Sequence, residues 1–362
     1  MSNSDIRVVP GPANYFSHPG SLERLSDFFS ADQLSRAVWV YGERALAGAE
    51  PFLPAAFHLP EAKKIRFTGH CSERDVAGLV QASGDDRAVV IGVGGGALLD
   101  SAKVLARRLG VPLVAIPTIA ATCAAWTPLS VWYSDAGQAL NFEIFDDANF
   151  LVLVEPRIIL NAPAEYLLAG IGDTLAKWYE AVVLAPQPKA LPLTVRLGIN
   201  GALAIRDVLL ASSETALADQ RRGDLTQAFR DVVEAIIAGG GMVGGLGERY
   251  TRVAAAHAVH NGLTVLPQTD KFLHGTKVAY GILVQSALLG QDDVLAQLVQ
   301  AYQRFNLPTT LAALEVDINN RAELDRVIAH TLRPGESIHY LPVTLTPEVL
   351  RAAFEKVEYF SR

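Results

Sequence analysis

Short apolar runs alternate with helical patterns over the first 155 residues. Runs rich in β-branched residues predict strands at residues 37–42, 64–69, 88–93, 112–117 and 150–154. The segments between them place apolar residues three or four positions apart and end in glycine, as in ALLDSAKVLARRLG. Strands that alternate with helices predict a parallel α/β sheet with helices on both faces.

The pattern changes at Pro156. Beyond it the chain shows long runs with helical spacing and almost no strand signal, as in AEYLLAGIGDTLAKWYEAVVLA and TVRLGINGALAIRDVLL. A length of 362 residues suits two domains better than one. We therefore predict an α/β dinucleotide-binding domain at residues 1–155 and an all-helical domain at residues 156–362.

Composition narrows the class of partner. The formal net charge of -7 gives no reason to expect a nucleic acid or a membrane surface as partner. Charged residues interrupt every apolar run well before 18 residues, so we expect no membrane-spanning helix, and the N-terminus lacks the pattern of a signal peptide. Cys71 and Cys123 are the only cysteines, which fits a protein of the reducing cytoplasm.

Asp173, His257 and His274 have the side chains of a catalytic divalent-metal site. A carboxylate oxygen and two imidazoles suit zinc or a similar ion, and three protein ligands leave a coordination position open for substrate. With 8 His and 38 acidic residues in the chain, some trio of this kind is expected by chance. The sequence around each residue strengthens this particular trio.

Each of the three residues falls at the end of a predicted helix, where side chains from separate elements converge. Asp173 begins a run whose apolar residues recur at helical spacing. His257 and His260 are three positions apart and share one face of another helix, which we expect to end near Gly262. His274 comes just before a further apolar helix. The pattern therefore predicts ligands from separate helices.

A glycine turn follows the predicted strand at residues 88–93. Gly94, Gly95 and Gly96 let a pyrophosphate approach the backbone, and the helix that follows offers free N–H groups and a positive dipole end. No acidic residue follows about 20 positions later to hold a ribose, so the ordinary dinucleotide fingerprint is incomplete. Strand, turn and helix together still favour a phosphate site over plain turn chemistry.

Longer segments resemble the iron-containing alcohol dehydrogenase superfamily, in its glycerol dehydrogenase-like branch. The matching segments are GVGGGALLDSAK, VPLVAIPTIAATCAAWTPLSVWY, LAGIGDTLAKWYEA and AAAHAVHNG followed by HGTKVAYG, in family order. Within that branch the chain looks most similar to bacterial hydroxycarboxylate dehydrogenases, which reduce 2-oxo acids with NADH or NADPH. The resemblance implies an N-terminal dinucleotide domain, an all-α C-terminal domain that binds metal and substrate, and a homo-oligomer.

Site positions carry over from the family motifs one by one. The implied metal ligands are Asp173, His257 and His274. The dinucleotide, NADPH or NADH, is expected to contact glycines, threonines and two larger residues of the first domain, namely Gly94, Gly95, Gly96, Thr118, Thr122, Thr127, Leu129 and Tyr133.

Lys177 departs from the pattern of the iron-binding relatives. Those relatives carry a fourth ligand, a histidine one turn after the aspartate, where this chain has Lys177. An ammonium group has no lone pair for a metal, so the resemblance implies a three-ligand site that is more like zinc than iron. A fixed cation also repels a metal ion. We expect Lys177 either to point away or to bind the substrate.

Cys123 departs from the pattern of the glycerol dehydrogenases. Those enzymes have a substrate-binding Asp at this position. Without that Asp carboxylate, the site no longer repels an anionic substrate, an effect worth ~1–4 kcal/mol at about 4 Å. Lys177 would then pair with a substrate carboxylate. Both changes favour a 2-oxo or 2-hydroxy acid over a neutral polyol. The alternative for Cys123 is a small buried residue without a role.

Gly42 departs from relatives that are strict for NAD. Those relatives carry an Asp at the end of the first strand, where it binds the ribose 2′-hydroxyl. Without that carboxylate a 2′-phosphate is not repelled, and Arg44 is a candidate partner for it. We therefore predict that NADPH is accepted alongside NADH. The competing interpretation makes Arg44 an ordinary solvated helix residue.

The predicted reaction is hydride transfer between a nicotinamide and the carbon of a metal-held C–O group. His260 is a candidate proton relay, and a supporting hydrogen bond is its alternative role. A glycerol or polyol dehydrogenase shares every motif and is the main rival. A non-catalytic descendant of the family is the third hypothesis, favoured only if Lys177 and Cys123 mark a decayed site.

Overall fold

The computed structural model describes residues 6–135, 137–185 and 190–362. Its contacts group the chain into two compact units, neither of them continuous in sequence. We call Val9–Pro163 together with Asp219–Gly245 the α/β unit. We call Ala164–Ala218 together with Leu246–Arg362 and the N-terminal segment up to Val8 the helical unit.

A parallel sheet forms the centre of the α/β unit, with the strand order β1-β8-β5-β4-β2-β3. These strands are β1 (Asn14–Ser17), β2 (Ala37–Tyr41), β3 (Lys63–Arg66), β4 (Val89–Gly94), β5 (Leu113–Pro117) and β8 (Leu151–Val154). All of the predicted strands are present, and the predicted fold class is confirmed. The short edge strand β1 was not predicted, because its residues are only half-buried and show no continuous apolar run.

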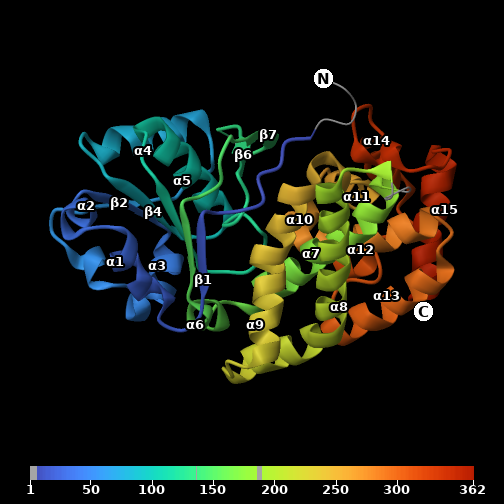
Figure 1. Cartoon of the computed structure of the whole chain (residues 1–362). Helices are drawn as coiled ribbons and strands as arrows, with labels where there is room; N and C mark the ends of the chain where they lie inside the picture. Colours follow the sequence, from blue (N-terminus) through green and yellow to red (C-terminus); the bar gives the residue numbers. More distant parts are fainter. Residues whose placement is uncertain (1–5, 136, 186–189) are drawn as a thin grey trace. The chain divides into compact units, whose positions relative to one another are not determined.

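Helices cover both faces of this sheet because successive strand residues point to opposite sides. Trp39, Ile91 and Ile116 enter one core with α1 (Leu25–Phe28), α2 (Ala31–Ser35), α3 (Glu43–Ala49) and α6 (Pro156–Leu160). Gly92 faces the opposite side and packs on Leu99 and Ala102 of α5 (Gly96–Leu109), which lies beside α4 (Glu73–Ser83). Figure 1 shows α4 and α5 on one side of the sheet and α1 and α3 on the other.

The chain reverses its winding direction between β2 and β4. From β2 the chain passes outward to β3, and β4 then returns to the other side of β2. In open parallel sheets the carboxyl ends of the strands at such a switch point form the usual ligand crevice. Those ends are Tyr41 with Gly42, and Gly94 with Gly95.

An antiparallel hairpin of β6 (Leu129–Tyr133) and β7 (Ala139–Ile144) packs beside α5. It was not predicted as a separate element. A buried ion pair on α5 holds it, because Asp100 Oδ2 accepts from the Val131 N–H and Lys103 Nζ donates to both Asp100 and the Leu129 carbonyl. Residues 140–144 of β7 are all exposed, including three large apolar side chains, at 65% for Leu140, 55% for Phe142 and 40% for Ile144.

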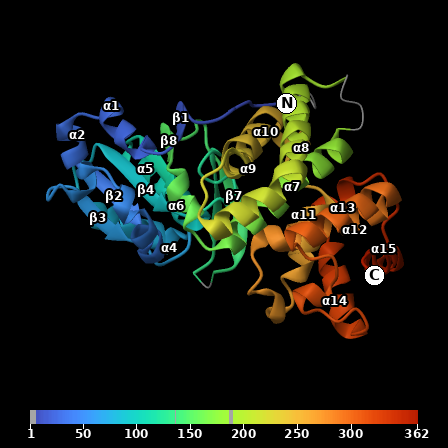
Figure 2. The ribbon, with the colours of Figure 1, turned by 90° about the horizontal axis from the view of Figure 1, so that it is seen from below.

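The helical unit contains α7 (Ala164–Leu184), most of α8 (Leu193–Arg222), α11 (Ala255–Leu263), α12 (His274–Leu288), α13 (Asp292–Phe305), α14 (Arg321–Thr331) and α15 (Pro347–Phe360). No strand occurs after β8 in the described part of the chain, as predicted. The helix α12 packs against both α7 and α11, and Figure 2 shows these three helices close together. Among the described helices, none combines the length and the apolar character that a membrane crossing requires.

The contacts of residues 219–245 assign them to the α/β unit, although most of α8 before them and the helices after them belong to the helical unit. They include α9 (Gln227–Glu234), a π-helical turn at Ala235–Gly239 and the start of α10 (Gly240–Gly247). A Cβ on Gly241 would lie 2.4 Å from the Trp126 ring, and one on Gly245 would lie 2.2 Å from the Val9 carbonyl oxygen. The glycines here therefore serve close packing.

Candidate active site

Asp173 lies in the middle of α7 and not at its start, so the predicted helix boundary is wrong. The helix begins at Ala164 because an apolar face with Leu167 and Ile171 already continues upstream of the aspartate. Gly170 and Gly172, which precede the aspartate, lie inside the helix and are buried. His257 is the third residue of α11, and His274 is the first residue of α12.

Close helix crossings next to each ligand bring the three side chains together. A Cβ on Gly275 would lie 1.9 Å from the Ala169 carbonyl oxygen, and one on Gly172 would lie 2.5 Å from the Gly275 carbonyl oxygen. A Cβ on Gly281 would lie 2.2 Å from the Ala256 carbonyl oxygen. Since these distances forbid a side chain, α12 contacts α7 and α11 through bare backbone. The neighbouring residues Asp173, His257 and His274 then face one another.

The ligand atoms of Asp173, His257 and His274 all lie within 4.8 Å of one another. Asp173 Oδ1 is 3.5 Å from His257 Nε2 and 3.2 Å from His274 Nε2. Asp173 is buried, His257 is half-buried, and the side chain of His274 is 44% exposed. The cluster therefore has a closed side made of helices and an open side at His274.

Glu180 fixes the orientation of His257. It lies on the same face of α7 as Asp173, two turns later, and its side chain is fully buried. Its Oε2 is 2.7 Å from His257 Nδ1, and its Oε1 accepts the backbone N–H groups of Ala254 and His257. Because a carboxylate only accepts, Nδ1 of His257 carries a proton, and Nε2 is the ring nitrogen that faces Asp173.

His260 contacts His274 rather than the Asp173 carboxylate. Its Nε2 is 3.0 Å from His274 Nδ1, and its Nδ1 is 3.0 Å from Asn261 Oδ1. The amide nitrogen of Asn261 donates to Glu336 Oε2 at 2.9 Å. The structure thus places the candidate proton relay against the ring of a candidate metal ligand.

Electrostatics favour a cation at this cluster. Burial acts to raise the pKa of Asp173, but the adjacent His257 and His274 outweigh it and hold that pKa well below its usual range. Burial acts to lower the pKa of His257, while the carboxylates of Glu180 and Asp173 raise it to about 9. Burial, reinforced by His274 and His257, holds the pKa of His260 well below its usual range.

The donor set fits a divalent metal ion. Asp173 Oδ1 is buried and accepts no well-aligned hydrogen bond from any described residue, although two imidazole nitrogens lie near it. An orphaned buried carboxylate oxygen is costly unless a cation satisfies it. One carboxylate and two imidazoles match the ligand preferences of zinc and leave a position open.

Lys177 and Cys123 lie on different units. Lys177 is half-buried on α7, one turn after Asp173, and its positive charge helps to lower the pKa of that carboxyl group. Cys123 belongs to the α/β unit, where its carbonyl accepts the N–H groups of Trp126 and Thr127. Its thiol is half-buried and forms no disulfide.

The glycine turn sits at the switch point of the sheet. Gly95 is the N-cap of α5 and makes no side-chain capping bond, so the N-terminal N–H groups of this helix have no cap from that residue. A Cβ on Gly95 would lie 2.8 Å from Ile119 Cδ1, and one on Gly96 would lie 3.5 Å from Thr122 Oγ1. The Thr118 N–H donates to the Gly94 carbonyl. The structure thus brings Thr118 and Thr122 against the three glycines.

The remaining predicted cofactor residues lie around this turn or along α5. Thr127 closes the turn that begins at Cys123. Leu129 and Tyr133 lie on β6, where the Leu129 carbonyl accepts from Lys103 and the Tyr133 N–H donates to the Cys71 carbonyl. Gly42 is the N-cap of α3, at the carboxyl end of β2.

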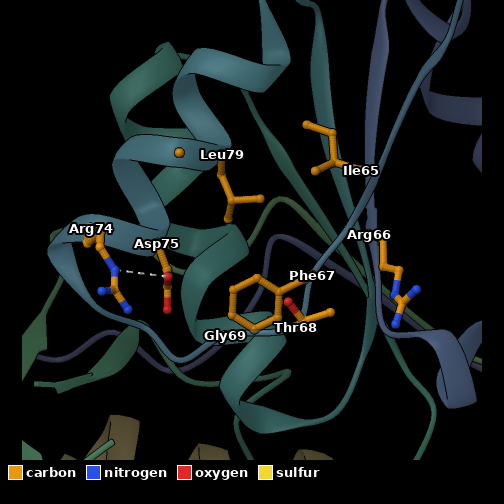
Figure 3. Close-up of a pocket in the computed structure, with 9 residues that line it drawn as sticks. Ile65, Arg66, Phe67, Thr68, Gly69, Arg74, Asp75 and Leu79 are labelled. Carbon is orange, nitrogen blue, oxygen red and sulfur yellow. Dashed lines mark ion pairs between the residues drawn. The ribbon is translucent and has the colours of Figure 1, made fainter. Parts of the chain in front are cut away.

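A cavity of about 260 Å³ lies one strand further out, between the carboxyl end of β3 and α4 (Figure 3). Phe67, Thr68 and Leu79 line it, and the Arg74–Asp75 ion pair lies at one side. Arg66 also lines it and pairs with Glu43 at the start of α3, with 2.7 Å between Nη2 and Oε2. The cavity contains none of the candidate metal ligands.

Known proteins match the whole chain. It is 80% identical to hydroxycarboxylate dehydrogenase A of Escherichia coli (strain K12) over 360 residues, which cover 99% of each chain. A model of the family described as iron-containing alcohol dehydrogenase matches residues 12–156. The chain belongs to the iron-containing alcohol dehydrogenase family. It is an oxidoreductase, and the predicted family resemblance is confirmed.

Members named glycerol dehydrogenase are also similar. The chain is 34% identical to the glycerol dehydrogenase of Pseudomonas putida over 356 residues, covering 96% of each chain. Among solved structures, a probable glycerol dehydrogenase from Sinorhizobium meliloti 1021 superposes with a TM-score of 0.85 at 29% identity, covering 98% of this chain and 99% of that one. These matches confirm the two-part architecture predicted from the sequence.

Sequence reasoning missed the residues that support the candidate metal ligands. Glu180 carried a usable signal, because it follows Asp173 by two helical turns and is an acidic residue in an apolar helix. Asn261 is adjacent to His260 and was treated only as a helix end. Glu336 gave no signal, since nothing in its neighbourhood connects it with a histidine so far away in the chain.

Proposed function

We propose that the chain reduces small 2-oxo carboxylic acids, such as 2-oxobutyrate or 2-oxoglutarate, to 2-hydroxy acids with NADPH or NADH. The supporting observation is the cluster of one buried carboxylate and two imidazole Nε2 atoms, next to Lys177 on the same helix. The name of the 80% identical relative, a hydroxycarboxylate dehydrogenase, points to the same class of substrate.

Asp173, His257 and His274 would hold one divalent ion, which we propose to be zinc. When bound, the ion polarises the substrate carbonyl and stabilises the negative charge that develops on its oxygen. Glu180 accepts the proton of His257 Nδ1, so Nε2 is the nitrogen that would bind the ion. The proposal of zinc rests on Lys177, which leaves three ligands where iron-binding relatives have four.

Lys177 is proposed to bind the substrate carboxylate. It lies one turn from Asp173 on α7, so an anion bound beside the metal ligands would be attracted to it. Cys123 supports the same substrate class, because this position carries no charge that would repel an anion. A proton for the product hydroxyl comes from solvent at the exposed His274 side, with His260 as its proposed relay.

Acceptance of NADPH is proposed from the carboxyl end of β2. Gly42 presents no carboxylate there, and a Cβ would meet nothing closer than 3.6 Å, so an Asp would fit sterically. Arg44 is exposed on α3, and Arg66 lies on the neighbouring strand. Measured kcat/KM with NADPH should fall about tenfold or more in Gly42→Asp, with little change for NADH, because the new carboxylate repels a 2′-phosphate.

Initial rates with a matched set of substrates test the proposed reaction. The expected result is faster turnover of 2-oxobutyrate or 2-oxoglutarate with reduced cofactor than of glycerol with oxidised cofactor, when each is compared as kcat/KM. The relatives named glycerol dehydrogenase favour the alternative, a glycerol or polyol dehydrogenase. A faster glycerol reaction would establish that alternative. No turnover of either class, in protein shown to contain zinc, would indicate a non-catalytic descendant.

We also propose a homo-oligomer in the cytoplasm. The exposed side chains of Leu140, Phe142 and Ile144 on β7 support self-association, since contiguous apolar residues on a surface usually mark an interface. Cys71 and Cys123 form no disulfide, which supports a reducing compartment. Sedimentation velocity measures the oligomeric state, and cell fractionation measures the compartment.

A further inference from the structure

A series of hydrogen bonds leads from Glu336 to the candidate metal ligand His274. Glu336 precedes the turn at Ser337–Tyr340, which packs on α11. Its Oε2 accepts from Asn261 Nδ2 at 2.9 Å, Asn261 Oδ1 is 3.0 Å from His260 Nδ1, and His260 Nε2 is 3.0 Å from His274 Nδ1. The opposite nitrogen of His274, Nε2, lies 3.2 Å from Asp173 Oδ1. Figure 1 shows α14, which precedes Glu336 in the chain, beside α11.

Glu336 gives this series a direction. A carboxylate only accepts hydrogen bonds, so the amide nitrogen of Asn261 must face it and the amide oxygen must face His260. That oxygen also only accepts, so His260 carries its proton on Nδ1. The Nε2 of a neutral His260 is then an acceptor, and His274 must donate from Nδ1. A neutral His274 is therefore left with a bare Nε2, the form that a metal ligand requires.

The two histidine ligands thus obtain the same tautomer in different ways. His257 contacts the buried carboxylate of Glu180 directly. His274 lies at the exposed edge of the cluster, and the hydrogen bond that its Nδ1 makes is to another imidazole. An imidazole donates in one tautomer and accepts in the other, so this contact alone does not select a tautomer.

We propose that Glu336 is a positioning residue that sets the tautomer of His274 through Asn261 and His260, and so keeps the His274 Nε2 lone pair directed at the metal position. This inference rests on the proposed metal centre for its function. The hydrogen-bond order itself is a property of the chain without metal.

Arg333 makes the inference testable with an isosteric change. Its Nε donates to Glu336 Oε1 at 2.7 Å, while Glu336 is 7% exposed and held in place. In Glu336→Gln, Arg333 still requires an oxygen, so the new amide nitrogen takes the place of Oε2 and faces Asn261. Asn261 must then turn its oxygen to Gln and its nitrogen to His260. Every bond in the series reverses, and His274 receives its proton on Nε2.

The first measurement is the tautomer of the histidine rings in metal-free protein, from ¹⁵N chemical shifts and long-range couplings of ¹⁵N-histidine. Wild-type protein is expected to carry the proton on Nδ1 in His260 and His274. This result needs no variant, so it tests the inference even if a substitution impairs folding. A wild-type His274 with its proton on Nε2 would overturn the inference.

The second measurement compares variants. Glu336→Gln is expected to move the His260 and His274 protons to Nε2, leave His257 unchanged, and weaken zinc binding at least tenfold. The double variant Glu336→Gln with Asn261→Asp should restore the Nδ1 protons of His260 and His274 and the affinity for zinc. The reason is that Asp accepts from the Gln amide and from His260 Nδ1 alike. Arg333→Met is the control, since it removes a contact of Glu336 but leaves the carboxylate and the wild-type order.

The outcomes separate the two proposals. Unchanged His274 tautomer and unchanged zinc affinity in Glu336→Gln would refute the positioning role of Glu336. Loss of zinc affinity in Glu336→Gln that the double variant does not restore would also refute it, because a merely structural defect has that signature. Wild-type protein with the expected tautomers but without zinc binding would refute the metal centre and leave the hydrogen-bond order standing.

Discussion

Gly275 shows how one residue controls the convergence of the ligands. A methyl group there would lie 1.9 Å from the Ala169 carbonyl oxygen and 2.9 Å from Asp173 Cβ. Backbone of α7 does not yield as a flexible side chain does. We expect Gly275→Ala to separate α7 from α12, to lower the free energy of unfolding by about 1–3 kcal/mol, and to weaken zinc binding.

Gly78→Ala is the matched control for this prediction. Gly78 lies inside α4, and a methyl group there would meet nothing within 4 Å. The change should be neutral or stabilising by about 0.5–1 kcal/mol. Urea denaturation measures stability, and a competition titration with a chelating dye measures zinc affinity. Equal effects of the two substitutions would contradict the close-crossing explanation.

Lys177 is also proposed to act as a single residue, through the positive charge of its side chain. Lys177→Ala is expected to raise KM for 2-oxobutyrate about tenfold, since an ion pair worth about 1.4 kcal/mol is lost. KM for an uncharged ketone of similar size should stay nearly constant. Lys177→Arg keeps the charge and should recover most of the affinity for the acid. Steady-state kinetics with both substrates decides the point, and a parallel rise in both KM values would exclude contact with the carboxylate.

At the scale of elements, Glu155 ties the start of α6 to the N-terminal loop. Its buried carboxylate accepts from the Gly20 N–H at 2.6 Å, from the Arg157 N–H and from the Arg157 guanidinium. Burial acts to raise its pKa, but these bonds outweigh burial and lower it. Glu155→Gln is therefore expected to lower the free energy of unfolding by about 1–2 kcal/mol at pH 7.

The difference in the free energy of unfolding between wild-type and Glu155→Gln protein should depend on pH with a definite sign. Because the pKa of Glu155 is lower in the folded than in the unfolded chain, its contribution is complete above the unfolded value of 4.5 and is lost as the pH falls through the folded value. Denaturation curves of wild-type and Glu155→Gln protein should therefore converge in acid. The exposed Glu61 provides the control for the substitution itself, and Glu61→Gln should leave the free energy of unfolding nearly unchanged. A stability difference that grows as the pH falls would contradict a lowered pKa of Glu155 in the folded chain.

Element prediction succeeded where burial is continuous and failed where tertiary contacts decide. The strands β2, β4, β5 and β8 are buried along almost their whole length, so their apolar runs are visible in the sequence. The hairpin of β6 and β7 depends on Asp100 and Lys103, distant residues that no local pattern reveals. The start of α7 was misplaced because glycine normally interrupts helices, whereas here it permits a crossing.

Site prediction shows a similar division. Asp173, His257 and His274 were identifiable because each has the chemistry of a ligand and lies in a recognisable motif. Glu180 and Glu336 were not, because an acidic residue in a long chain has no distinctive chemistry until its partner is known. Their partners, His257 and Asn261, come from other helices or turns, and only the folded chain brings them together.

At the scale of the whole molecule, the two sets of candidate ligands belong to different units. The metal ligands lie in the helical unit, and the glycine turn lies in the α/β unit. Zinc at 100 times its Kd should raise the free energy of unfolding of the helical unit by about 2.7 kcal/mol. Hydrogen exchange should slow mainly in α7, α11 and α12.

This prediction has a matched pair of variants. His257→Ala removes a ligand and should abolish the effect of zinc. His330→Ala changes a histidine of the same unit on α14, outside the cluster, and should preserve the effect. Exchange measured with and without zinc, each compared with chelator-treated protein, provides the test. Protection spread evenly over both units would contradict a site confined to the three helices.

The distribution of the ligands over three helices also orders events during synthesis. A chain that has left the ribosome only as far as α11 exposes one carboxylate and one imidazole, too few to retain an ion against competing cellular chelators. The third ligand emerges with α12, and that helix must settle against both neighbours before the trio closes. An ion held by all three side chains would therefore bind only after α12 has packed on α7 and α11, and a chain that ends before α12 should bind zinc weakly.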